Sequence, residues 1–592
     1  MKANLIMVKE GQQETCIRGN YSRFGNSLVT IRAPKTPLAK RKALVFALSV
    51  AALVAVMMLA ARPAHADTFT VNSTGDGGDQ APSGVCNTAP FPVGTEPECT
   101  LRAAIEEANT TAAPDTINFN IGGSGVKTIS PTSFLPIVTE PVTINGYSEP
   151  GATENTLAAG DNAELRVRLN GTGTQSLSYG LFITADDSVV RGLSITNFTI
   201  AAIRIATADN NTIEGNFVGI TPSGEDAGNG DGISIAGNSA TPPEGAVNNT
   251  VGGATPRARN VISGNDSTGV AIGGSGTTGN KVMGNYIGTT KSGTGDRGNS
   301  GRGAIIYDSA SGNTIGDDDP TDGLTAANTI AFNGGNGVQV SYVASTGNRI
   351  LSNSIFSNAG LGIDLGGDGV TPNDGPGDAD TGPNNLQNFP VISSAVTSGT
   401  KTTIKGTLEG LPSQSQIAEG YTIQFFSNPK SANDEGKKYI GERIVFDTDG
   451  DGIIPFAFEP PNKVKEGLFV TATATNNSTG DTSEFSKAVL VKDAVKPTVT
   501  PLTPKPGSKT RDTTPTIRAK VTDKATNLAK SNIRLFVDGK RKANFAYNRS
   551  TDRLTYKAGR LSFKRHTVRI VARDAADNVA SKTWRFTVKK RR

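Results

Sequence analysis

The chain is poor in cysteine and histidine. Only three of its 592 residues are cysteine and two are histidine. Beyond Asp67 the sequence keeps Cys86, Cys99 and His566, and the histidine lies far from both thiols along the chain. Two thiols without a neighbouring imidazole do not provide the four ligands of a usual zinc site. A Cys/His metal centre is therefore not expected.

Long apolar runs are also scarce, and the longest lies near the N-terminus. Residues 43–61 are uncharged and mostly apolar, follow Lys40-Arg41-Lys42 and precede Ala64-His65-Ala66. A basic region, an apolar stretch and small residues before the cleavage point are typical of a secretory signal. We predict that 1–66 is a signal peptide with an extended n-region, cut between Ala66 and Asp67.

An uncleaved membrane anchor is the alternative for this segment. The apolar run is long for a signal and approaches the length of a membrane-spanning helix. The positive charge before the run places the bulk of the chain outside in either case. We therefore expect a secreted or cell-surface protein that contacts a membrane only through this segment, if at all.

Export bears on the two remaining cysteines. Disulfides form and persist in oxidising compartments, and Cys86 and Cys99 make an even pair. We expect them to be bridged. A disulfide that closes such a short loop stabilises a fold by about 3 kcal/mol.

Asparagine and glycine recur in a long internal repeat. Asn-x-(Ile/Val) units begin at Asn260 and Asn280 and again at Asn328 and Asn348, so that both pairs are 68 residues apart. Such a short unit cannot bury its apolar face alone and must stack on its neighbours. Corners rich in Asn, Gly, Thr and Ser suit tight turns, exclude a helical solenoid and allow stacked asparagines to form hydrogen-bonded ladders.

This repeat predicts a parallel β-helix over about 115–390. A β-sandwich with irregular turns is the alternative, but its strands would not keep a constant offset. A β-helix has an open end that needs a cover. Leu101, Ala104, Ile105 and Ala108 have helical spacing, with Glu106 and Glu107 on the outer face, so we expect a short capping helix there.

The same segment carries a resemblance to a known family. Cys99-Thr-Leu-Arg-Ala-Ala-Ile-Glu-Glu-Ala-Asn109 is similar to the Cys-Ser-Leu-Arg-Glu-Ala (CSLREA) segment of secreted bacterial β-helix proteins, and departs from it at Thr100 and Ala103. The resemblance covers about Phe69–Pro390. It implies a right-handed, pectin-lyase-like parallel β-helix and export, without an established activity.

Two further modules follow the repeat. Alternating strands from about residue 393 predict a β-sandwich over 393–494. A proline-rich stretch at 496–506 is then expected to act as a semi-stiff linker. Residues 495–592 resemble the immunoglobulin-like (Ig-like) repeats of bacterial surface proteins. The predicted fold is thus all-β, with a capped β-helix over 67–392 followed by two β-sandwiches.

Charge is divided sharply along the chain. The net charge is +8 over 1–66, −23 over 67–495 and +20 over 496–592. The basic last module favours an anionic partner such as a cell-envelope polymer. The alternative is a sandwich with solvated outer side chains, because alternation already places Arg518, Lys520, Arg569 and Arg573 outward. Nucleic acid is a weaker candidate, since no aromatic platform accompanies the charge.

Acidic residues gather near the predicted end of the β-helix. A Gly/Pro-rich segment there contains Asp364, Asp368, Asp374, Asp378 and Asp380, which could hold Ca²⁺. Calcium is the one cofactor that the sequence suggests, and the predicted function does not require it. Aspartate is also common in turns that bind no metal, because its side chain accepts hydrogen bonds from the nearby backbone. A polygalacturonase-type hydrolase is disfavoured because 67–392 contains no histidine. A lyase that uses Ca²⁺ and an Arg or Lys base stays open.

A second acidic segment resembles the start of an EF-hand loop. Asp447-Thr-Asp-Gly-Asp451-Gly fits, but the twelfth position is Phe458 and the glutamate comes one residue late. We therefore predict a hairpin turn between 444–446 and 453–456.

Taken as a whole, the sequence favours an adhesin-like or structural protein. Its β-helix flank would bind a linear glycan or another envelope component, and the two sandwiches would space or attach it. The rival hypothesis is a polysaccharide lyase or related carbohydrate-active enzyme that acts on an acidic polysaccharide. A passive stalk without a ligand is the third.

Overall fold

The computed structural model describes residues 4–10, 13–19, 65–80, 84–88, 97–174, 178–238, 240, 242–317, 326–412, 419–429, 434–524 and 527–590. It divides into two compact units, Met1–Ala66 and Asp67–Arg592. The first unit contains the antiparallel strands β1 (Asn4–Glu10) and β2 (Gln13–Gly19). The predicted signal segment 43–61 lies outside the described residues, and cleavage before Asp67 stays a prediction.

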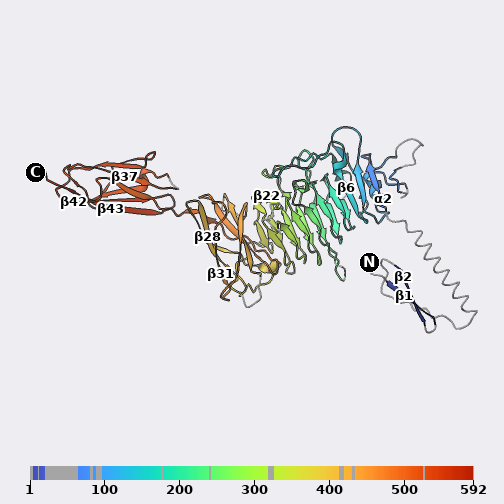
Figure 1. Ribbon diagram of the computed structural model, residues 1–592. Helices are drawn as coiled ribbons and strands as arrows, with labels where there is room; N and C mark the ends of the chain where they lie inside the picture. Colours follow the sequence, from blue (N-terminus) through green and yellow to red (C-terminus); the bar gives the residue numbers. More distant parts are fainter. Residues whose placement is uncertain are drawn as a thin grey trace, which may run out of the picture. The chain divides into compact units, whose positions relative to one another are not determined.

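The second unit begins with three long parallel sheets, whose strands stack as successive coils in Figure 1. Sheet 1 contains, in spatial order, β24 (Arg349–Leu351), β21 (Thr314–Gly316), β18 (Lys281–Met283), β15 (Thr250–Gly252), β12 (Thr212–Glu214), β9 (Val189–Arg191), β6 (Val142–Asn145), β4 (Asp115–Phe119) and β3 (Thr68–Val71). Sheet 2 contains β25 (Ser354–Phe356), β22 (Thr329–Ala331), β19 (Tyr286–Ile287), β16 (Val261–Ile262), β13 (Phe217–Val218), β10 (Leu193–Thr196), β7 (Val167–Asn170) and β5 (Lys127–Ile129). Sheet 3 contains β26 (Ile363–Leu365), β23 (Val338–Val340), β20 (Ala304–Tyr307), β17 (Val270–Gly273), β14 (Asp231–Ala236), β11 (Ala201–Ala206) and β8 (Tyr179–Ile183).

The core of this β-helix is built from rows of aliphatic side chains. Side chains alternate along a strand, so each short strand sends one or two apolar residues inward. The inward residues Ile213, Val251 and Val282 of sheet 1 are in register from coil to coil and have no exposed surface. The fold prediction is confirmed: the chain forms a parallel β-helix.

Asparagine ladders run along the coils, as predicted. The amide of Asn280 donates to Oδ1 of Asn313 (2.9 Å) and to the carbonyl of Ala246 (2.8 Å), while its Oδ1 accepts from the amide and the backbone N–H of Asn249. A buried polar group is tolerated when all its hydrogen bonds are made. The three ladders comprise Asn211, Asn249, Asn280, Asn313, Asn348 and Asn384; Asn216, Asn260, Asn285, Asn328 and Asn353; and Asn229, Asn265, Asn299, Asn333 and Asn358.

The helix α2 (Leu101–Ala108) covers the first coils, as predicted, and Cys86 and Cys99 form the expected disulfide. The side chain of Thr100 caps the helix by accepting from the backbone N–H of Ala103 (3.1 Å). One expectation is wrong: Glu107 does not face outward. Its side chain is fully buried and accepts from the backbone N–H of Gly84 (2.9 Å), because the disulfide-linked segment folds over the helix.

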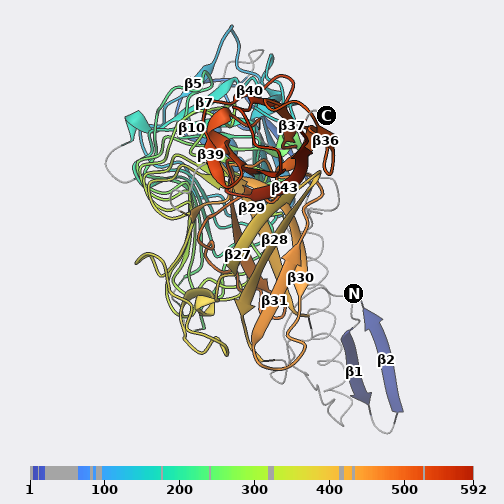
Figure 2. The ribbon, with the colours of Figure 1, turned by 90° about the vertical axis from the view of Figure 1, so that its left-hand side faces the viewer.

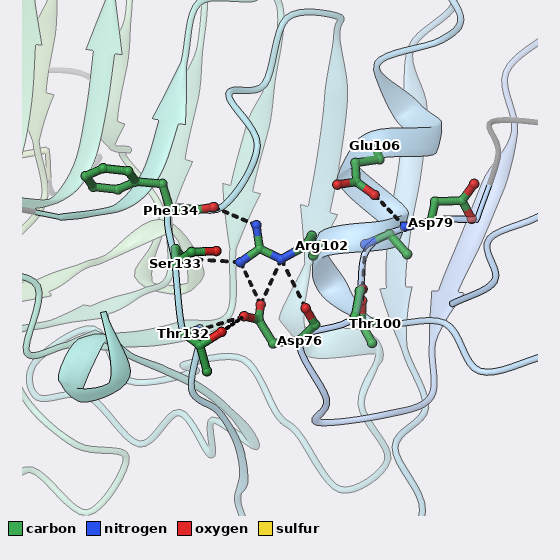
Figure 3. A network of polar contacts seen from close by, with 10 residues as sticks. Asp76, Asp79, Thr100, Arg102, Glu106, Thr132, Ser133 and Phe134 are labelled. Atoms are coloured by element: carbon green, nitrogen blue, oxygen red, sulfur yellow. Dashed lines mark hydrogen bonds and ion pairs between the residues drawn. The ribbon is translucent and has the colours of Figure 1, made fainter. Parts of the chain in front are cut away.

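Arg102 joins the cap to the next loop (Figure 3). Its guanidinium pairs with the carboxylate of Asp76 (2.8 Å) and donates to the carbonyl oxygens of Ser133 and Phe134. Asp76 in turn accepts from the hydroxyl and the backbone N–H of Thr132. These contacts hold the cap on the β-helix through a partly buried charge pair.

Two β-sandwiches follow. The first sandwich has two four-stranded sheets, formed by β27 (Val391–Ser398), β28 (Lys401–Glu409), β31 (Ile453–Phe458) and β34 (Lys492–Asp493), and by β29 (Tyr421–Asn428), β30 (Lys438–Val445), β32 (Phe469–Asn476) and β33 (Val489–Leu490). The second sandwich consists of β35 (Thr498–Thr503), β37 (Thr516–Thr522), β40 (Ala546–Asn548) and β41 (Arg553–Lys557), and of β36 (Lys509–Thr510), β38 (Ile533–Val537), β39 (Lys540–Lys542), β42 (Arg565–Arg573) and β43 (Val579–Val588). The 3₁₀ turns among the described residues are η1 (Gly146–Ser148), η2 (Gly171–Gly173), η3 (Pro256–Ala258), η4 (Pro383–Leu386) and η7 (Lys530–Asn532).

Two expectations for this region are wrong. The acidic segment 447–451 is not a hairpin turn, because β30 and β31 belong to different sheets of the first sandwich (Figure 2). The aspartate carboxylates instead accept backbone N–H groups within the connection, as in the bond from Gly450 to Asp447 (3.0 Å). The proline-rich stretch is not merely a linker, since 498–503 forms the edge strand β35. Proline fits an edge strand because no ladder hydrogen bond needs its missing N–H.

The first sandwich closes the far end of the β-helix. Phe426 and Phe485 belong to the same buried apolar cluster as the inner rows of the coils. Ile355 forms a β-bridge to Gly436 of the first sandwich. The described helices include none that is long and apolar enough to cross a membrane.

Candidate functional site

The structure separates the five predicted acidic residues into two groups. Asp374, Asp378 and Asp380 come together, with one carboxylate oxygen of each within 4.8 Å of the others. Asp364 and Asp368 do not join them. Asp364 lies on β26 and accepts from the amide of Asn336 (2.8 Å). Burial raises the pKa of Glu484, and the charges of Asp364 and Asp368 add to the rise.

The first group, which we call the acidic loop, combines turn contacts with closely spaced carboxylates. Both carboxylate oxygens of Asp374 accept hydrogen bonds, from the amide of Asn388 (3.2 Å) and from the backbone of Ala379 (2.9 Å). Burial, reinforced by the neighbouring aspartates, raises the pKa of Asp378 to about 7. These contacts fit the turn role that aspartate often has. The same three carboxylates are also suitable ligands for Ca²⁺. Calcium binding at the acidic loop stays a proposal.

A second feature, which sequence reasoning missed, is the outer row of sheet 3. One residue from each strand points outward between two buried aliphatic neighbours, and these residues are in register along the whole sheet. The row consists of Phe182, Arg204, Ser234, Ala271, Ile305, Gln339 and Asp364. At about 4.8 Å between strands, it extends for about 29 Å.

The first half of the row combines aromatic rings with a cation. The rings of Tyr179 and Phe182 lie 5.2 Å apart, and both side chains are partly exposed. Arg204 donates to the hydroxyl of Ser234 (2.6 Å). Burial raises the pKa of Tyr307, although the adjacent Arg204 opposes the rise. Within the described part of the chain, Arg204 is thus held beside an aromatic ring and forms no ion pair with an acidic side chain.

The second half of the row is a network of planar polar groups. The amide of Asn336 donates to Gln339 (3.1 Å) and to Asp364 (2.8 Å), and Arg302 also donates to Gln339. Gln339 in turn donates to the hydroxyl of Ser341 (2.7 Å). Each side chain is therefore oriented by its neighbours. The sequence signal for such positions is a single polar residue between two aliphatic ones in a very short strand, as in Val338-Gln339-Val340.

Sheet 2 differs, because the chain itself covers part of its outer face. The segment 155–165 packs there against Phe217, Val261 and Tyr286. Arg259 lies 4.5 Å from the centre of the Tyr286 ring and donates to three backbone carbonyls of this segment. In the outer row of sheet 3, Phe182, Arg204 and Ile305 are partly exposed, whereas Ser234, Ala271, Gln339 and Asp364 are buried.

The basic residues of the second sandwich lie as alternation predicts. Arg518 and Lys520 on β37, and Arg569 and Arg573 on β42, are exposed. Arg569 lies over the ring of Phe536 (4.4 Å). The second sandwich therefore presents cations on both of its sheets.

Comparisons with known proteins leave the family open. No family model matches the chain, and no curated protein matches it. Among solved structures, the tailspike protein 2 active domain of bacteriophage CBA120 is 12% identical, covers 70% of this chain and 76% of its own, and has a TM-score of 0.18. The fibronectin(III)-like modules of Clostridium thermocellum CbhA are 19% identical, cover 34% of this chain and 95% of their own, with a TM-score of 0.18. Likenesses this weak carry no argument about activity.

Proposed function

We propose that this protein is exported and binds a linear glycan, or another envelope polymer, along the outer row of sheet 3. The observation that carries the proposal is the continuity of that row over seven strands in register. An extended polymer needs an extended surface, and a β-helix supplies one because each coil repeats the same position.

The chemistry of the row suits a sugar polymer. Aromatic rings such as Phe182 offer flat apolar surface for the faces of sugar rings. The partly exposed guanidinium groups of Arg204 and Arg302 and the carboxamide of Asn336, on or beside the row, offer hydrogen bonds at fixed angles to hydroxyl groups. Arg204 and Arg302 would also favour acidic sugars, since guanidinium pairs well with carboxylate.

Export and retention follow from other parts of the chain. The disulfide between Cys86 and Cys99 is typical of proteins from oxidising compartments. The disulfide-linked cap and α2 support membership in the exported CSLREA-type proteins. The exposed cations of the second sandwich, such as Arg518 and Arg569, would hold the protein on an anionic envelope polymer.

A polysaccharide panel tests this function. The unit 67–592 would be incubated with acidic and neutral polysaccharides, with and without Ca²⁺, and both binding and release of new chain ends would be measured. Binding without release supports the proposal. Release of new ends would replace it with the lyase hypothesis, and absence of binding to any polymer of a broad panel would leave the passive stalk.

A further inference from the structure

Three aspartates meet where the first sandwich joins the second. Asp493 ends β34 of the first sandwich, whereas Asp523 and Asp574 follow β37 and β42 of the second. One carboxylate oxygen of each lies within 4.8 Å of the others. Asp493 and Asp574 are each only 3% exposed. Three negative charges are thus confined to a largely buried volume.

Asp493 leaves one oxygen without a partner. Its Oδ1 accepts from the backbone N–H of Val495 (2.9 Å), while its Oδ2 is buried and makes no hydrogen bond. Among the described residues, neither Asp493 nor Asp574 pairs with a lysine or arginine. A buried ionised carboxylate needs a compensating charge or hydrogen bond. The orphaned oxygen is therefore an observation that points to a ligand.

Neighbouring groups reinforce the concentration of oxygen atoms. The amide of Asn578 donates to the backbone carbonyl of Asp493 (2.8 Å) and to Oδ2 of Asp574 (2.9 Å), so it ties the two sandwiches together. Burial and the charges of Asp493 and Asp574 raise the pKa of Glu466. The aspartate charges therefore also act on a neighbouring glutamate.

We propose that Asp493, Asp523 and Asp574 bind one Ca²⁺ ion. Calcium takes six to eight oxygen ligands at 2.3–2.6 Å, so two ligands on opposite sides of the ion are about 5 Å apart. Carboxylate oxygens within 4.8 Å of one another can therefore share a single ion. Magnesium, with ligands at about 2.1 Å, would require a tighter cluster.

Such an ion would act as a clamp between the sandwiches. Its ligands come from both sides of the short connection 494–497, so binding would restrict rotation about that connection. The site is independent of the sheet 3 row and of the acidic loop. It assigns a mechanical role to Ca²⁺, namely a fixed orientation of the basic second sandwich.

Calorimetric titration of the metal-free unit 67–592 with CaCl₂ tests the proposal. Asp493→Asn should remove one Ca²⁺ per chain from the binding isotherm, because asparagine keeps the acceptor for Val495 but loses the charge. The matched control is the double variant Asp374→Asn/Asp380→Asn, which alters the acidic loop and should leave this site intact. An unchanged stoichiometry and affinity in Asp493→Asn would overturn the proposal.

Small-angle X-ray scattering supplies a second readout that does not depend on that variant. Ca²⁺ should narrow the distribution of interatomic distances of the wild type, and excess chelator should broaden it again. If Asp493→Asn does not fold, the partly exposed Asp523→Asn serves in its place in both measurements. Identical scattering of the wild type with Ca²⁺ and with chelator would refute the clamp.

Discussion

Oε1 of Glu435 accepts a hydrogen bond from the backbone N–H of Asn358 (2.8 Å), in the position that the next asparagine holds elsewhere in the ladder. Glu435 belongs to the first sandwich, and its Oε2 also accepts from the backbone of Ser357 (2.7 Å). The last rung of the ladder is therefore completed by another domain. The first sandwich closes the β-helix and therefore contributes to the stability of the β-helix.

Loss of this contact should destabilise the β-helix. Glu435→Ala would leave the backbone N–H groups of Asn358 and Ser357 without acceptors, which costs about 2 kcal/mol. Glu435→Gln, which keeps one carbonyl oxygen, should lose clearly less. Urea denaturation followed by circular dichroism would measure both. Equal stability of Glu435→Ala and the wild type would contradict the closing role.

The interior of a ladder should be more sensitive than the surface. Asn280→Ala removes five hydrogen bonds at a position with no exposed surface, and leaves a backbone N–H of Asn249 buried and unpaired. We expect a loss of about 3 kcal/mol in the free energy of unfolding. The exposed Asn120→Ala is the control and should stay within about 0.5 kcal/mol of the wild type. Similar losses in both variants would show that a buried ladder asparagine contributes no more to the free energy of unfolding than an exposed one.

The disulfide should stabilise the cap. Cys86 and Cys99 are 13 residues apart, and closing a loop of this size contributes about 3 kcal/mol. Cys86→Ser/Cys99→Ser should unfold at correspondingly lower urea concentration, and dithiothreitol should affect only the wild type. A wild type insensitive to complete reduction, verified by thiol titration, would contradict this expectation.

The acidic loop should make stability depend on pH. The pKa of Asp378 is about 7 in the folded protein, against an ordinary value of 3.8. The folded state therefore holds this proton more tightly, and stability should fall as pH rises from about 4 to about 7. Asp378→Asn removes the titration. In chelator-containing buffer, the wild type should lose more stability than the variant between pH 5 and pH 8, as measured by urea midpoints.

Glu484 serves as the internal control for this comparison. Burial raises its pKa to about 7 as well, so it contributes a slope of the same sign to both proteins. The difference between the two profiles therefore belongs to Asp378. Parallel profiles for the wild type and Asp378→Asn would show that the carboxyl group is not buried as described.

Much of the fold can be predicted from the sequence, because a regular repeat of short units is compatible with few folds other than stacked coils. Asn280 and Asn348 mark equivalent corners, and their spacing alone indicates stacked coils. The burial of Glu107 could not be predicted, since helical spacing does not reveal that a distant segment folds over the helix. The Asp447 segment likewise gives the same turn signal whether the chain returns to the same sheet or crosses to the other.

The candidate sites were predicted less well. Asp374, Asp378 and Asp380 do meet, because the segment that carries them turns tightly. Asp364 instead continues the outer row that starts at Phe182, and only the coil register shows it. The row joins residues nearly 200 positions apart, so no local pattern marks it as one surface.

The central claim is that a polymer binds along the outer row of sheet 3, and one affinity measurement tests it most directly. Arg204→Ala removes a cation from the row, while Arg168→Ala removes a similarly placed arginine of sheet 2 that donates to the hydroxyl of Thr196 (3.0 Å). With the best-binding polysaccharide of the panel, Arg204→Ala should weaken the affinity about tenfold, or about 1.4 kcal/mol, and Arg168→Ala should leave it unchanged. Unchanged affinity in Arg204→Ala, or equal loss in both variants, would contradict the claim.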